Sequence, residues 1–304
     1  MRAAVVSSLL VLFGVHLAFA DADRTPSPAT RVSCDCNAFD AAIAEAEKIY
    51  ESRNEDIEMP LTPVMHDRYR ARVDAAYGRA VCLAACVNVP EKDRNRARML
   101  IAESGFKEAS LGAGEWKARL QIVYEAMARC LAIDPQHRGC MMWHAGSRGI
   151  LARGSWNPLN ITLPLSLMAE FKAARGNERP GCDHDDGSAT RGEASMLLKV
   201  PRYAGGNPTA GRELIESAAK IAPKFGCRLA NRLVVAEALG RTGDNLAAAR
   251  ELRAIIAGGL PACGPERYEN AMSLQEAERC LARIEALPNE DPGWDTDCRR
   301  EARE

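Results

Sequence analysis

Alanine-rich segments that end at a proline recur after Pro90 in this 304-residue chain. Residues 126–135 and 214–223 are the clearest, and weaker copies end at Pro261 and Pro288. Alanine favours the helix interior and proline cannot continue a helix, so each segment predicts a helix end. Pro223 and Pro261 lie 38 residues apart, close to the ~34-residue period of repeats built from two helices. The chain is therefore expected to stack helix pairs.

The composition agrees with an all-helical fold. Aromatic residues, which favour strands, make up only 5% of the chain. We expect an all-α fold, a right-handed α-α superhelix of tetratricopeptide-like (TPR-like) helix pairs over residues 91–287. In the turn 240–244, glycine suits the left-handed end of one helix, and Asp244 caps the next. The helices expected here are 140–152, 163–174, 190–200, 208–221, 228–239, 245–256 and 266–286.

An N-terminal helical hairpin over residues 37–90 is expected to precede the repeats. Its first helix spans 37–55, with Asn37 as the cap, and its second spans 66–87. In an antiparallel hairpin, the start of the first helix lies beside the end of the second. Cysteines occur at both of these ends, so two disulfides between the ends are predicted, and a metal site is the alternative. The four cysteines are Cys34 and Cys36 at one end and Cys82 and Cys86 at the other.

A second cysteine pair, Cys130 and Cys140, flanks the turn between two helices. A disulfide there is one interpretation; free thiols are another. A metal site that adds His137 and His144 is the third, because the spacing of these four residues suits metal ligands. The chain has eleven cysteines, so at least one thiol is left over. Cys227–Cys263 and Cys280–Cys298 are the further pairs we expect, with Cys182 unpaired.

The N-terminus resembles a secretory signal peptide over residues 1–20. Arg2 precedes an apolar run, and small residues permit cleavage before Asp21. An uncleaved membrane anchor is the alternative. Residues 21–36 are expected to be a flexible lead-in, and 288–304 a loose tail. We expect a periplasmic or secreted protein, whose mature chain has no transmembrane segment. The net charge of −1 gives no reason to expect a nucleic-acid partner.

No catalytic motif is found in the sequence. There is no phosphate-binding Gly-Lys-Ser/Thr loop, no nucleophile elbow and no His-Glu-x-x-His. A non-enzymatic protein without cofactor or metal is therefore expected. Stacked helix pairs present a concave face lined by their first helices, which binds proteins or small molecules. We expect this groove to include Trp143, Trp156, Leu163 and Leu165, although simple burial would explain the same residues.

Residues 118–286 resemble the T-component of tripartite ATP-independent periplasmic (TRAP) transporters. The likeness rests on short segments in a shared order, each weak alone. They are Trp143 with Gly146; Val200-Pro201 with Gly205-Gly206-Asn207, Ala210, Leu214 and Ala218; Val235-Ala236-Glu237 with Gly243-Asp244; and Glu269-Asn270 with Ala277-Glu278.

The resemblance implies an accessory component of periplasmic solute uptake. Its partner would be a periplasmic solute-binding protein, and its ligand a small apolar molecule. A non-enzymatic binding or scaffold protein is therefore the first functional hypothesis. The second is a metal- or thiol-active protein that uses the group Cys130, His137, Cys140 and His144.

Overall fold

The computed structural model of the chain describes residues 34–110, 116–152, 162–264 and 266–287, together with Trp294 and Cys298. Over these residues every regular element is helical, and none is a strand. The expected signal peptide, most of the lead-in, most of the C-terminal tail and Trp156 lie outside the described residues.

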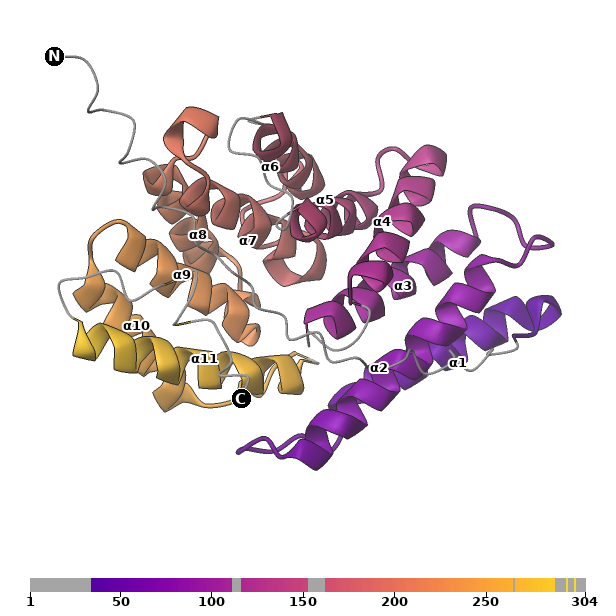
Figure 1. Cartoon of the computed structure of the whole chain (residues 1–304), viewed down its shortest axis with the longest axis horizontal. Helices are drawn as coiled ribbons and strands as arrows, with labels where there is room; N and C mark the ends of the chain where they lie inside the picture. The colour runs from indigo at the N-terminus through magenta and orange to yellow at the C-terminus, as the bar shows by residue number, and fades with distance from the viewer. Residues whose placement is uncertain are drawn as a thin grey trace, which may run out of the picture.

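Consecutive helices pack against one another along the whole described chain, which confirms the all-α architecture of stacked helix pairs (Figure 1). The α-helices are α1 (Phe39–Glu51), α2 (Pro63–Ala84), α3 (Arg94–Ser110), α4 (Trp116–Ile133), α5 (Arg138–Ala152), α6 (Thr162–Arg175), α7 (His184–Lys199), α8 (Pro208–Ile221), α9 (Leu229–Arg241), α10 (Asn245–Gly258) and α11 (Arg267–Ala286). Short 3-10 turns are η1 (Cys36–Ala38), η2 (Ser52–Asn54), η3 (Arg202–Ala204) and η4 (Phe225–Cys227).

Local signals explain several helix boundaries. Helix α8 starts at Pro208, and the side chain of Asn207 accepts the backbone N–H of Ala210. The turn before α10 has Gly243 at φ +89°, and Asp244 accepts the N–H of Ala247, as expected from the sequence.

One expected cap is wrong. Helix α1 starts at Phe39, and Asn37 does not cap it. Instead, the side chain of Asp35 accepts the backbone N–H of Asn37 and caps the short turn η1. The chain therefore enters α1 through a 3-10 turn rather than directly, because a second capping residue lies two positions upstream.

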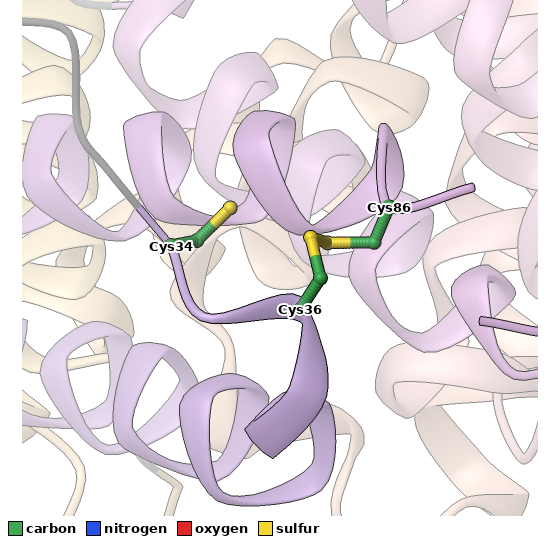
Figure 2. Close-up of side chains that lie close together, drawn as sticks. All are labelled: Cys34, Cys36 and Cys86. Carbon is green, nitrogen blue, oxygen red and sulfur yellow. A yellow bond between two sulfur atoms is a disulfide. The ribbon is translucent and has the colours of Figure 1, made fainter. Parts of the chain in front are cut away.

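Two disulfides close the N-terminal hairpin of α1 and α2, as expected. Cys34 is bonded to Cys82, and Cys36 to Cys86. Figure 2 shows Cys36 and Cys86 joined where η1 meets the end of α2. The hairpin is not an isolated unit, because its buried residues belong to the same apolar core as those of α3 to α6.

The described chain has two main cores. The first is built from α1 to α6, and the second from α8 to α11. Helix α7 contributes to both, with Ala189 in the first core and Ala194 and Leu198 in the second. We call α1–α6 the N-terminal half and α8–α11 the C-terminal half.

A third, smaller core joins the two ends of the superhelix. Its buried members from the hairpin are Ile57, Tyr69 and Val73, and those from α11 are Tyr268 and Ala271. The first and last parts of the stack therefore touch, and the helices form a closed ring (Figure 1). We call this contact the seam.

Candidate functional site

A cleft of about 910 Å³ is lined by residues from both halves of the chain. Its walls come from α1, α3, α5 and the segments that lead into α9 and α11, which are the first helices of their pairs. The lining residues are Glu47, Tyr50, Glu51, Arg53, Lys92, Asn95, Arg96, Met99, Leu100, Glu103, Lys107, Asp134, His137, Trp143, Arg228 and Glu266.

Helix α3 supplies the longest wall of the cleft. Arg96, Met99, Glu103 and Lys107 recur every three or four residues, so they share one face of the helix. The apolar Met99 lies between charged residues at the two ends of this face. The cleft therefore has two polar ends with an apolar segment between them.

At one end of the cleft, five charged residues form a buried cluster. Lys107 Nζ donates to Glu266 Oε1 at 2.8 Å and lies 3.1 Å from Glu269 Oε1. Arg228 pairs with the other oxygen of Glu266 at 2.6 Å. Arg53 Nε donates to Glu269 at 3.4 Å, and its side chain is only 4% exposed. Three cations thus surround two carboxylates away from bulk water.

The environment keeps Glu266 and Lys107 ionised at neutral pH. Burial alone would raise the pKa of Glu266, but the charges of Lys107 and Arg228 lower it to about 2. Burial alone would lower the pKa of Lys107, but Glu266 and Glu269 raise it above its usual value. Burial raises the pKa of the neighbouring Tyr50 phenol, so that group stays neutral. Glu266 and Lys107 are therefore a pair of fixed charges rather than a proton-transfer pair.

The other end of the cleft is more open to solvent. Arg96 Nε donates to Glu47 Oε1 at 2.6 Å, which links α3 to α1. His137 lies in the turn before α5, where its Nδ1 accepts the backbone N–H of Cys140 at 3.2 Å. Lys92 and Asp134 complete this end.

Of the three expected groove residues that the structure describes, Trp143 lines this cleft. Trp143 packs on Phe106 at a centroid distance of 5.0 Å, and its indole N–H has no acceptor among the described residues. Leu163 packs against the first core, and Leu165 is 47% exposed beside Gly205, so neither reaches the cleft. Most of the side chains that line this cleft are charged.

The cysteine-histidine group is divided in the structure. Cys130 and Cys140 form a disulfide, and a ring nitrogen of His137 lies within 4.8 Å of both sulfurs. His144 faces elsewhere: its Nδ1 contacts Glu170 at 2.9 Å. The four-residue metal site expected as an alternative is not assembled. The group of three could hold a metal only after the disulfide is reduced.

The remaining cysteines pair as the sequence led us to expect. Cys227 is bonded to Cys263, and Cys280 to Cys298, while Cys182 is an exposed free thiol. Five disulfides indicate a protein that folds outside the reducing cytoplasm.

The buried cluster was missed by sequence reasoning. Arg53, Lys107 and Glu266 are far apart in the chain, and no short motif joins them. The one available signal was the run of polar residues along one face of α3.

No helix in the described part of the chain is long and apolar enough to cross a bilayer. Compared with known protein families and with characterised proteins, the chain matches none of them.

Proposed function

We propose that this protein is a non-enzymatic binding protein whose cleft holds a small polar ligand with ionised groups. The observation that carries the proposal is the lining of the cleft, where charged side chains of both signs occupy each end. A pocket that buries such groups favours a ligand that pairs with them. The apolar ligand suggested by the family resemblance fits this lining poorly.

The middle of the cleft adds shape selectivity. Met99, Leu100 and Trp143 offer apolar surface between the two charged ends. The indole N–H of Trp143 is buried and has no acceptor among the described residues. A zwitterion or organic acid with a short carbon skeleton matches a cleft that has an apolar middle between two polar ends.

The described lining residues of the cleft include no serine, threonine or cysteine that could act as a nucleophile. Lys107 and Glu266, which could act in covalent catalysis, are held in an ion pair with each other at 2.8 Å. His137, the single histidine in the lining, uses Nδ1 to accept a backbone N–H. Binding without chemical conversion is therefore the function that this geometry favours.

The sequence supports an exported location for this activity. Residues 1–20 have the features of a signal peptide, and the five disulfides favour the periplasm or the extracellular space. The resemblance over residues 118–286 favours a role beside a periplasmic solute-binding protein of a TRAP-type system. A ligand-binding ring beside such a protein would receive or deliver its solute.

The test is a ligand screen on the disulfide-bonded chain that starts at Asp21. Thermal shifts would be measured with amino acids, dicarboxylic acids, sugar acids and fatty acids, and any hit would be followed by calorimetry. Arg96→Gln removes a charge from the open end of the cleft, where Arg96 is half-exposed. We expect this variant to weaken binding at least roughly tenfold, equivalent to about 1.4 kcal/mol.

Arg253→Gln is the matched control. Arg253 forms an exposed ion pair with Glu285 at 2.8 Å, and it is not part of the cleft. Its substitution should leave the affinity unchanged. A preference for fatty acids, or a polar ligand whose affinity ignores Arg96→Gln, would overturn the proposal.

A further inference from the structure

The seam that closes the ring is a contact between units that are not neighbours in the stack. In a helical solenoid each unit normally contacts only its neighbours in the stack, so the stack can flex by small changes at each of these contacts. Here Tyr69 of α2 stacks on Tyr268 of α11 with ring centroids 3.8 Å apart. Because the chain links the two halves only through α7, separating the seam leaves every contact between successive helices in place.

Polar contacts surround the small apolar core of the seam. Across it, Arg267 donates to the carbonyl of Ile57 at 3.2 Å, and the N–H of Tyr268 donates to Asn54 Oδ1 at 2.8 Å. The hydroxyl of Tyr69 donates to Glu269 Oε1 at 3.0 Å. Polar contacts of this kind can be exchanged for contacts with water. The apolar part of the seam is small beside the two main cores.

The seam also shares residues with the cleft. Arg53 and Lys107 belong to the N-terminal half, whereas Arg228 and Glu266 belong to the C-terminal half, and all four line the cleft. The pairs of Lys107 and Arg53 with Glu266 span the two halves at 2.8 and 3.9 Å. A charged ligand in the cleft therefore contacts the groups that hold the ring shut.

We propose that the seam is a latch: the ring opens between the N-terminal hairpin and α11 to admit the ligand. The bending is distributed along the stack, with α7 as the link between the two cores. A bound ligand that pairs with Arg53 or Lys107 on one side and Arg228 or Glu266 on the other keeps the latch closed. This last step rests on the proposed function, whereas the opening itself does not.

The experiment is hydrogen–deuterium exchange on the full disulfide-bonded chain, without ligand. Glu269→Gln weakens the seam, because Glu269 pairs with Arg53 and Lys107 and accepts from Tyr69. We expect amides in 53–61 and 266–274 to exchange at least roughly tenfold faster together, since opening exposes both sides at once.

Glu251→Gln is the control, because Glu251 forms a similar ion pair with Arg232 at 2.7 Å outside the seam. It should leave exchange at 53–61 and 266–274 unchanged. Acceleration confined to 266–274 would indicate local fraying of α11 and overturn the latch. Uniform acceleration over the whole chain would indicate global unfolding and overturn it as well.

A distance measurement covers the case in which Glu269→Gln folds poorly. Spin labels at Val64 and Leu246, which are exposed in opposite halves, would be introduced by cysteine substitution in a Cys182→Ser chain. With Glu269 intact, we expect a second, separate distance population besides the closed one. A single narrow distance would overturn the latch, although ligand binding could still be detected in the screen above.

Discussion

Replacement of Glu266 by glutamine tests the charged cluster most directly. The carboxylate is 8% exposed and pairs with Lys107 at 2.8 Å and with Arg228 at 2.6 Å. Glutamine keeps the size of the side chain but removes its charge. The two cations then stay buried with less compensation, which is the costly way to break a buried ion pair.

The magnitude follows from the pKa of Glu266. Its pKa falls from 4.5 to about 2 in the folded protein. A shift of one pKa unit corresponds to about 1.4 kcal/mol, so the ionised carboxylate contributes about 3 kcal/mol to folding at pH 7. Because the pKa is lowered by folding, this stabilisation is fully present above pH 4.5, the ordinary pKa of the carboxyl group in the unfolded chain. It is lost as the pH falls towards 2, because the folded state then takes up the proton as well.

The assay is urea unfolding of the disulfide-bonded protein at pH 7 and at pH 3. We expect Glu266→Gln to lower the free energy of unfolding by about 3 kcal/mol at pH 7, and the difference to shrink by roughly 2 kcal/mol at pH 3. Glu285→Gln, at an exposed ion pair with Arg253, should change little at either pH. A Glu266→Gln variant as stable as the parent at pH 7, or a difference independent of pH, would refute the reasoning.

Two further predictions concern the backbone and the thiols. Gly243→Ala should cost about 1–2 kcal/mol in urea unfolding, because Gly243 has φ +89° and alanine is strained there. Gly258→Ala, where an added Cβ meets nothing within 4 Å and φ is ordinary, should not destabilise; equal losses at both sites would contradict this. When the unreduced protein is denatured and alkylated, its intact mass should show one modified thiol, at Cys182. Modification of Cys130 or Cys140 would support the metal- or thiol-active hypothesis instead.

The helix pairs near the C-terminus could be predicted from the sequence because their boundaries are local. Helix α8 spans Pro208–Ile221, as expected, since Asn207 and the following proline mark its start. The hairpin disulfides were predictable for a related reason. Once two helices are antiparallel, their ends are neighbours, and the cysteines at those ends have few other partners.

The charged cleft and the seam could not be predicted in this way. A charged residue in a helix usually indicates a face towards solvent, yet Arg53 is 4% exposed and Glu266, just before α11, is 6% exposed. Their burial depends on the curvature of the whole stack, which brings α11 back to the hairpin. No periodicity within one helix encodes that curvature, because it accumulates from small rotations between successive pairs.

The ring is closed partly by buried ion pairs, and this choice of contact needs a physical reason. Buried ion pairs are weak contributors to net stability, and apolar residues of similar size often hold a contact more firmly. A seam built for permanence would rely on extensive apolar contacts, such as those that the two main cores contain. This seam instead places Arg53, Lys107 and Glu266 where they also face the cleft. Such groups can exchange one charged partner for another, so closure of the ring and occupancy of the cleft draw on the same interactions.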